Sequence, residues 1–312
     1  MHIKALWELF RFGITTILFK RKDPLVGSLI LTDRCNLACK HCAVGNLTGM
    51  DYSYAQIRAD METLYAQGVR ILFFYGGEPF LWREQGITLR DLVIEAKGMG
   101  FILVSVVTNG TFPLTLPEAD WILVSLDGGR ARHNEIRGDT YDLILDHVQK
   151  SAAGNICLYM AINKINLGDI ETVCETAKTT RNVRAVSFNF HTPYPGTESL
   201  KLSPEEKQAC CLRITNQMEQ GTPVLNLKSA LPSIADHGFK TPCWQCVVIE
   251  NGKQWVCGRC IDIPGLCEEC GFFFAAEFSL LFSGKARVVL DMIKTYGKFI
   301  LSYSSEKKRG AE

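Results

Sequence analysis

Short apolar runs alternate with longer amphipathic stretches between residues 27 and 220. Most runs are continuous rather than alternating with polar residues, which is typical of parallel strands covered on both faces. The predicted strands are 28–32 (SLILT), 70–75 (RILFFY), 102–108 (ILVSVVT), 121–126 (WILVSL), 156–162 (ICLYMAI) and 185–190 (AVSFNF). Helices are predicted between them, for example at 52–68, 140–152 and 203–221. The last of these opens with a capping-box pattern, Ser203 followed by Glu206.

Strand–helix repeats of this kind predict an α/β fold, either a barrel or an open parallel sheet with right-handed crossovers. Functional side chains in such folds gather at the carboxyl ends of the strands. The periodicity ends near residue 241, where closely paired cysteines begin. We therefore predict a large α/β domain followed by a small cysteine-rich C-terminal extension.

Thirteen cysteines are present, and nine of them fall into four tight clusters. The first cluster, CNLACKHC, places Cys35, Cys39 and Cys42 just after the first predicted strand. The N-terminal stretch shows no cleavable export signal, which predicts a cytoplasmic protein with reduced thiols. The clusters are therefore interpreted as metal ligands rather than as disulfides.

Three thiolates on one loop can bind three irons of a four-iron cluster and leave the fourth iron open to another ligand. Catalytic zinc sites likewise keep one coordination position free for substrate. For CNLACKHC taken alone, a zinc ion with a distant fourth ligand is therefore the alternative interpretation.

Further motifs follow the later predicted strands. They are GGEP (76–79), TNG (108–110), SLDG (125–128), AINKINL (161–167) and FNFHTPYPG (188–196). With CNLACKHC, they make residues 26–220 resemble the radical S-adenosylmethionine (radical SAM) enzymes, in particular the branch that modifies peptides and cofactors. The resemblance implies a partial (β/α)6 TIM-like barrel. It also implies that Cys35, Cys39 and Cys42 are catalytic ligands of a [4Fe–4S] cluster whose open iron binds S-adenosylmethionine (AdoMet).

The same resemblance implies a set of contacts to AdoMet. They are His41, Gly76, Gly77, Glu78, Pro79, Thr108, Asn109, Ser125 and Asp127. Glycine lets the backbone approach a ligand closely, and the carboxylate of Glu78 suits an ammonium group. His41 departs from the family, which often has an aromatic residue before the third cysteine, but an imidazole is also flat and can lie against adenine.

Three CxxC pairs follow within 28 residues, and Asn251-Gly252 between the first two predicts a two-residue hairpin. The predicted metal ligands are Cys243, Cys246, Cys257, Cys260, Cys267 and Cys270. A hairpin followed by cysteines resembles the auxiliary-cluster segments called SPASM or twitch, although the spacing departs from the SPASM pattern. We expect a second iron–sulfur cluster here, with a zinc knuckle as the alternative. Six thiols exceed the four that one centre needs.

The remaining candidates have simpler interpretations. Cys157 and Cys174 are expected to pack in the core, as buried free cysteines commonly do. His133 is interpreted as structural. His191 follows the sixth strand, and it either faces the substrate or anchors its loop.

Both ends of the chain carry apolar side chains at helical spacing. These stripes are Ile3, Leu6, Trp7, Phe10, Ile14 and Ile17, and Val289, Met292, Ile293, Tyr296, Phe299, Ile300 and Tyr303. Such stripes usually pack on a core. A peripheral membrane contact is the alternative, because 1–22 and 285–312 are both basic although the whole chain has a net charge of +1. The predicted organisation is an N-terminal helix (1–23), a radical SAM core (24–240), the cysteine-rich segment (241–272) and a C-terminal helix (273–312).

The predicted function is that of a radical SAM oxidoreductase, which cleaves AdoMet reductively at a [4Fe–4S] cluster and abstracts hydrogen from an unactivated C–H bond. Peptide or cofactor maturation is the expected setting. The alternative substrate is a hydrophobic small molecule, such as a tetrapyrrole or chlorin side chain or a lipid. An iron–sulfur or zinc scaffold is the non-enzymatic alternative. An external electron donor such as flavodoxin or ferredoxin is expected, and no nucleic-acid partner is predicted.

Overall fold

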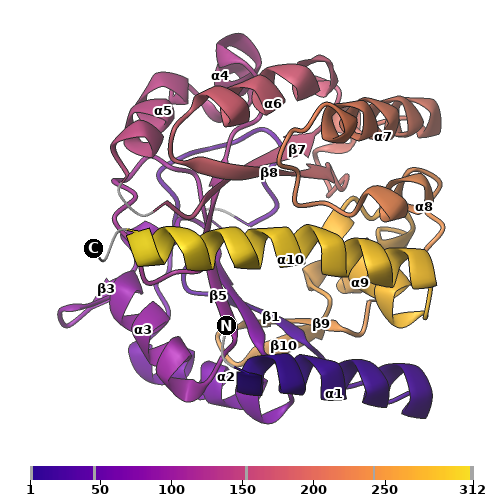
Figure 1. Ribbon diagram of the computed structural model, residues 1–312. Helices are drawn as coiled ribbons and strands as arrows, with labels where there is room; N and C mark the ends of the chain where they lie inside the picture. Colours follow the sequence, from indigo (N-terminus) through magenta and orange to yellow (C-terminus); the bar gives the residue numbers. More distant parts are fainter. Residues whose placement is uncertain (1–2, 45–46, 152–153, 242, 310–312) are drawn as a thin grey trace.

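The computed structural model describes residues 3–44, 47–151, 154–241 and 243–309. An eight-stranded sheet forms its centre, in the order β10-β9-β1-β2-β5-β6-β7-β8, and every neighbouring pair except β9–β10 is parallel (Figure 1). The strands are β1 (Val26–Ile30), β2 (Ile71–Tyr75), β5 (Leu103–Thr108), β6 (Trp121–Ser125), β7 (Ile156–Ile162), β8 (Val183–Phe190), β9 (Cys246–Glu250) and β10 (Lys253–Val256). A separate small hairpin pairs β3 (Arg83–Glu84) with β4 (Ile87–Thr88).

Helices alternate with these strands along the chain. They are α2 (Tyr54–Ala66), α3 (Leu89–Met99), α4 (Arg130–Arg137), α5 (Tyr141–Lys150), α6 (Ile170–Thr179), α7 (Pro204–Glu219) and α8 (Leu231–Ala235). Short 3-10 turns are η1 (Pro79–Leu81), η2 (Leu167–Asp169), η3 (Glu198–Leu200), η4 (Lys228–Ala230), η5 (Arg259–Asp262) and η6 (Cys267–Glu269). The α/β class and all six predicted strands are confirmed. The capping box of Ser203 and Glu206 is also confirmed at the start of α7.

The two faces of the sheet have different roles. Alternate side chains such as Leu72, Val104 and Ile122 are fully buried in the main hydrophobic core, and α2, α3 and α6 contact the strands that carry this core. The intervening side chains, among them Phe73 and Leu123, line an internal cavity instead. Because strand side chains alternate between faces, one continuous apolar run supplies both the core and the cavity wall.

The cysteine-rich segment adds two strands to one end of the sheet and then contacts the strand at the opposite end. Its hairpin turns at Asn251-Gly252, where both residues have positive φ (47° and 78°), as the sequence predicted. The strand β9 pairs with β1, at the opposite end of the sheet from β8. Further along, Phe190 at the end of β8 donates its N–H to Gly271, and Gly271 donates to Thr192 Oγ1. The segment therefore runs from one edge of the sheet to the other.

The C-terminal region differs from its prediction. The single helix expected in 273–312 is wrong, because the structure has two helices, α9 (Phe273–Phe282) and α10 (Ala286–Arg309). Ser283 caps α9, and Gly284 has a φ of 79°, the left-handed conformation that commonly ends a helix. Figure 1 shows α10 lying across the front of the sheet.

The apolar stripes at the ends of the chain pack on the protein in part. On α10, Val289, Met292 and Tyr296 pack against the main core, whereas Ile293 is exposed. At the other end, α1 (Ile3–Phe19) exposes Trp7. The side chains of Ile3, Leu6, Phe10, Ile17, Phe299, Ile300 and Tyr303 lie outside the described part of the structure. Across the described residues, no helix has the length and apolar character needed to cross a bilayer.

Candidate active site

The loop after β1 carries the first three cysteines, and each of their sulfur atoms accepts a hydrogen bond from an N–H group. Asn109 Nδ2 lies 3.7 Å from Cys35 Sγ, Arg137 Nη1 lies 3.7 Å from Cys39 Sγ, and the Val44 N–H lies 3.4 Å from Cys42 Sγ. Burial raises the pKa of the Cys35 and Cys39 thiols, that of Cys39 to about 11. Hydrogen bonds to sulfur are a feature of thiolate-ligated iron–sulfur clusters, so this donor set fits such a group.

The GGEP backbone lies directly against this cysteine loop. The Gly77 N–H donates to Thr32 O at 2.8 Å, and the Glu78 N–H donates to Arg34 O at 2.9 Å. A Cβ atom added to Gly76 or Gly77 would stand within 3.0 Å of the Thr32 or Arg34 carbonyl oxygen, respectively. The two glycines are therefore required by the close approach of two backbones.

Glu78 is completely buried behind this contact. Its Oε1 accepts hydrogen bonds from Thr108 Oγ1 (2.7 Å) and the Phe80 N–H (3.1 Å), and its Oε2 accepts one from the Asn109 N–H (2.7 Å). Burial raises the pKa of this carboxyl to about 7. The side chain thus joins GGEP to TNG, and its expected role against an ammonium group stays a prediction.

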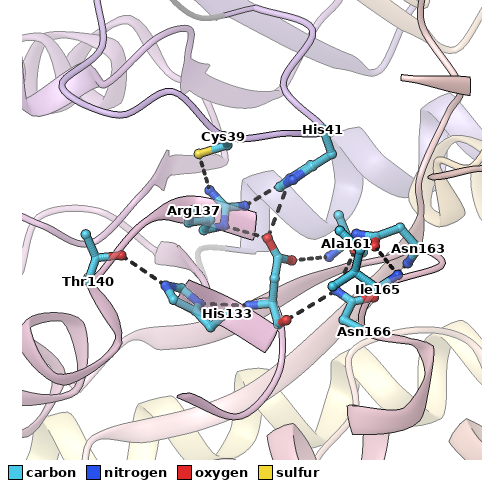
Figure 2. A network of polar contacts seen from close by, with 10 residues as sticks. Cys39, His41, His133, Arg137, Thr140, Ala161, Asn163, Ile165 and Asn166 are labelled. Carbon is cyan, nitrogen blue, oxygen red and sulfur yellow. Dashed lines mark hydrogen bonds and ion pairs between the residues drawn. The ribbon is translucent and has the colours of Figure 1, made fainter. Parts of the chain in front are cut away.

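Figure 2 shows a second buried network, which includes Cys39, His41, His133, Arg137 and Ala161. Asp127 contacts the last three of these. Its Oδ2 accepts a hydrogen bond from Arg137 Nε at 2.5 Å, and its Oδ1 accepts one from the Ala161 N–H at 2.8 Å. Although burial opposes ionisation, the charge of Arg137 holds the pKa of Asp127 below its ordinary value. The pair fixes the guanidinium beside Cys39.

Two histidines complete the network. Arg137 Nη2 lies 3.3 Å from His41 Nε2, and since arginine can only donate, this nitrogen accepts. Burial lowers the pKa of His41 to about 4, so the ring is neutral. His133 Nδ1 accepts from the Asp127 N–H at 3.1 Å, and its Nε2 lies 3.1 Å from Thr140 Oγ1. These contacts support the structural role expected of His133.

A cavity of about 390 Å³ opens beside these groups. Predicted site residues that line it are Cys35, Cys39, His41, Cys42, Gly76, Gly77, Thr108, Asn109, Ser125, Cys257 and Cys260. Glu78, Pro79 and Asp127 are buried behind the wall. His191 also lines the cavity, and its ring stands edge-on to that of His41 at a centroid distance of 6.2 Å. The buried positions of Cys157 and Cys174 confirm that they pack in the core.

Of the six later cysteines, Cys257 and Cys260 line the cavity. The neighbouring thiol of Cys243 raises the pKa of Cys257, that of Cys257 raises the pKa of Cys260, and burial together with Cys260 raises the pKa of Cys267. Cys246 and Cys270 are close enough to add electrostatically to this group. None of the thirteen cysteines, all of which lie in the described ranges, forms a disulfide. In the described ranges, no three His, Cys, Asp or Glu side chains are arranged to hold a single metal ion.

Three charged cavity residues were not predicted from the sequence. Arg137 and Arg259 are paired with carboxylates, Arg259 through a bond of 2.6 Å from Nη2 to Glu250 Oε1. Arg259 lies inside CGRC, and Glu277 is the single charge in GFFFAAEFSLLFSG, so the sequence held a signal for both. Nothing in the sequence distinguishes Arg137 from the exposed arginines near it.

Comparison with known proteins defines the class. The profile of the Radical SAM superfamily matches residues 29–177, which include the cysteine loop and the motifs after β2, β5 and β6. Residues 29–177 therefore match the domain of a family of enzymes that use a [4Fe–4S] cluster and AdoMet.

A curated protein is similar to part of this chain. Fe-coproporphyrin III synthase of Methanosarcina barkeri (strain Fusaro / DSM 804) is 29% identical over 227 residues, which are 65% of this chain and 55% of that protein. This chain therefore spans little more than half the length of that relative.

Solved structures share the fold. SuiB of Streptococcus suis, bound to its precursor peptide SuiA, has a TM-score of 0.60 at 14% identity, covering 91% of this chain and 70% of its own. The enzyme anSMEcpe with bound AdoMet has a TM-score of 0.56 at 17% identity, covering 85% and 79%.

The contact between GGEP and the cysteine loop predicts a steric effect on stability. We expect Gly77→Ala to lower the free energy of unfolding by about 1–3 kcal/mol, because the added methyl meets the Arg34 carbonyl. Gly98→Ala is the matched control, since it lies in α3 with nothing within 4 Å of the new Cβ. It should raise the free energy by roughly 0.5–1 kcal/mol. Urea denaturation measures both, and equal stability of Gly77→Ala and wild type would contradict the constraint.

Proposed function

We propose that this enzyme cleaves AdoMet reductively, with Cys35, Cys39 and Cys42 holding the [4Fe–4S] cluster, and abstracts hydrogen from an unactivated C–H bond. The observation that carries the proposal is that all three cysteines line the same cavity as the Gly76-Gly77 backbone. A cluster and AdoMet bound at the loop would therefore share one cavity with a substrate.

Cys35, Cys39 and Cys42 would hold the cluster, which would supply an electron for the cleavage of AdoMet to methionine and the radical that abstracts hydrogen. The chain itself must bind, orient and exclude water. Leu103, Val107 and Leu123 give the cavity an apolar strand wall that disfavours water. Asn109 and Arg137 direct N–H groups at two of the sulfurs. The electron is expected from an external donor such as flavodoxin or ferredoxin.

A hydrophobic small molecule is the substrate class that the cavity wall favours. Phe73, Phe274 and Phe278 line the cavity together with apolar strand residues. The similarity to Fe-coproporphyrin III synthase supports a substrate of this kind in cofactor maturation. Burial of aromatic and aliphatic surface would supply most of the affinity.

A peptide is the second candidate substrate. SuiB was solved with the precursor peptide SuiA, and anSMEcpe with a Cp18Cys peptide, on the fold that this chain shares. On this interpretation an apolar side chain of the peptide would enter the cavity while the rest of the peptide stayed outside.

The first test is AdoMet cleavage. Anaerobically reconstituted protein, reduced with dithionite, should convert AdoMet to 5′-deoxyadenosine, measured by chromatography. The triple variant Cys35→Ala/Cys39→Ala/Cys42→Ala should lose this activity. Cys174→Ala is the control, because this thiol is buried in α6 away from the cavity, and it should keep the activity. A triple variant that still produces 5′-deoxyadenosine would overturn the assignment.

We also propose that residues 241–272 hold a second iron–sulfur cluster. The position of Cys257 and Cys260 on the cavity wall supports it, as do the electrostatic interactions of Cys243 with Cys257 and of Cys260 with Cys267. A centre there could accept the electron left on a substrate after hydrogen abstraction, which would make the net reaction a two-electron oxidation. Structural zinc is the alternative.

Metal analysis of the triple variant distinguishes the two metals. Because the variant lacks the first cluster, about four irons per chain should remain if the later cysteines bind a [4Fe–4S] cluster. Iron, sulfide and zinc are measured together with the visible absorbance. If zinc is found and no iron absorbance remains, the metal site of this segment is structural and cannot accept an electron.

A membrane contact is proposed for the N-terminal patch, defined as Trp7, Leu18 and Phe19 with Lys20, Arg21 and Lys22. The three apolar side chains are 63%, 70% and 72% exposed, and the three basic residues are also exposed. Trp7 and Leu18 lie eleven residues apart, close to three helical turns, and so share one face of α1. Apolar groups beside basic ones suit the surface of an anionic bilayer.

Liposome co-sedimentation tests this patch. The protein should sediment with anionic vesicles, and less so as salt rises, because ions screen the basic residues. Leu18→Ser/Phe19→Ser should weaken the binding. Leu212→Ser removes an equally exposed leucine on α7 and should leave binding unchanged. Protein that remains in the supernatant at low salt would show that the patch does not bind membranes.

A further inference from the structure

Glu277 is a buried acid on an otherwise apolar helix, α9 (FFAAEFSLLF). The residue is 4% exposed, and it lines the internal cavity together with Phe274 and Phe278. These positions are three residues before it and one after it. Phe274, three residues before Glu277, is its neighbour on the helix surface, and Phe278 lines the same cavity.

One oxygen of this carboxyl is held by the protein. Oε1 accepts hydrogen bonds from the Leu227 N–H (2.9 Å) and from Asn226 Nδ2 (3.2 Å). Asn226 is itself fixed to β8, because it accepts from the Phe188 N–H at 2.7 Å and donates to Phe188 O at 3.2 Å. The carboxyl group is therefore positioned rather than free to rotate, and both of these donors bind the same oxygen, Oε1.

Glu277 is also the unpaired charge of the cavity. The other charged side chains that line it in the described structure are Arg137 and Arg259, and each has a carboxylate partner, Asp127 and Glu250. No lysine, arginine or histidine of the described residues forms an ion pair with Glu277. Burying an ionised acid without a cation is costly, so the carboxyl is favoured in its neutral form until a cation reaches it.

We propose that Glu277 is a ligand-binding residue, which accepts a hydrogen bond from an ammonium group carried by an otherwise apolar substrate. The aromatic rings beside it would contact the apolar body of that ligand, and the carboxylate would compensate its charge. The proposal deepens the proposed function, because it concerns the cavity in which the substrate would bind.

A purely structural role makes a different prediction. If Glu277 serves only to hold Leu227 and Asn226, then Glu277→Gln should preserve that role, since the amide oxygen can replace Oε1. The variant would, however, present an NH2 donor where the carboxylate presents an acceptor. The variant therefore keeps the fold but replaces a hydrogen-bond acceptor on the cavity wall with a hydrogen-bond donor.

Two probes of nearly equal shape provide the test, 1-naphthylmethylammonium and the neutral 1-naphthalenemethanol. Calorimetric titration of the reconstituted full chain at about pH 8 should show the ammonium probe binding about tenfold more tightly, as expected for a hydrogen bond to a charged group. Glu277→Gln should remove this preference. Equal binding of the two probes to wild type, or an unchanged preference in Glu277→Gln, would overturn the proposal.

Asp291→Asn is the matched control. Asp291 lies on α10 outside the cavity wall, and its charge acts on Glu277 from nearby. Its acceptor bond from the Ser229 N–H (2.8 Å) can be kept by the amide oxygen. The preference for ammonium should persist in this variant. If it falls as far as in Glu277→Gln, a general negative field rather than a direct contact selects the cation, and the proposal fails.

The pH dependence of the ammonium preference is measured on the wild-type protein, so this test does not depend on the folding of a variant. Burial raises the pKa of Glu277 to about 7, so protonation below that value should reduce the ammonium preference between about pH 8 and pH 6. The titratable groups facing it are Asp291 and Tyr296 of α10, and burial raises the pKa of Tyr296 far above this range. Repeating the measurement on Asp291→Asn at both pH values removes any contribution of Asp291 to the change in preference. A preference that does not fall on acidification would contradict the proposal.

Probe binding and AdoMet cleavage are independent measurements. An ammonium preference in a protein that does not cleave AdoMet would leave the Glu277 site standing and refute the proposed chemistry. AdoMet cleavage without an ammonium preference would support the proposed chemistry and refute the Glu277 site.

Discussion

The close approach between the glycine pair after β2 and the loop after β1 is the constraint on which the site depends. Gly76 and Gly77 lie so near the Thr32 and Arg34 carbonyls that no side chain fits between the two backbones. Glu78 then extends this contact to Thr108 and Asn109 after β5. Three consecutive strand ends of the sheet are thereby joined before any ligand binds, which is the preorganisation that a reactive site requires.

A second buried group gives the other half of the site its shape. Asp127 after β6 binds Arg137 of α4 and the backbone of Ala161 in β7, so one carboxylate connects three elements. Arg137 in turn reaches Cys39 and His41. A buried pair of this kind adds little net stability, but it fixes the direction of the N–H groups that face the cysteine loop.

The sequence allowed the strands and several strand-end motifs to be predicted because these features are local. Continuous apolar runs, a capping box at Ser203 and the Asn251-Gly252 turn each depend on neighbouring residues. The break between α9 and α10 was missed, because the apolar pattern continues on both sides of Gly284. Arg137 was missed for another reason. Asp127 is 10 residues away from Arg137 and Cys39 is 98 residues away, so only the folded structure shows that Arg137 contacts both.

The same distinction explains the cysteine-rich segment. Its hairpin was predictable, but its pairing with β1 and its return to the end of β8 are long-range contacts. Those contacts join the two edges of an otherwise open sheet, and the later cysteines lie along that connection. A metal centre bound by Cys257 and Cys260 would therefore crosslink the segment that closes the cavity, and metal binding would be coupled to closure. The residues proposed to accept an electron would then also help to keep water from the substrate, so oxidation of the substrate and its protection would depend on the same part of the chain.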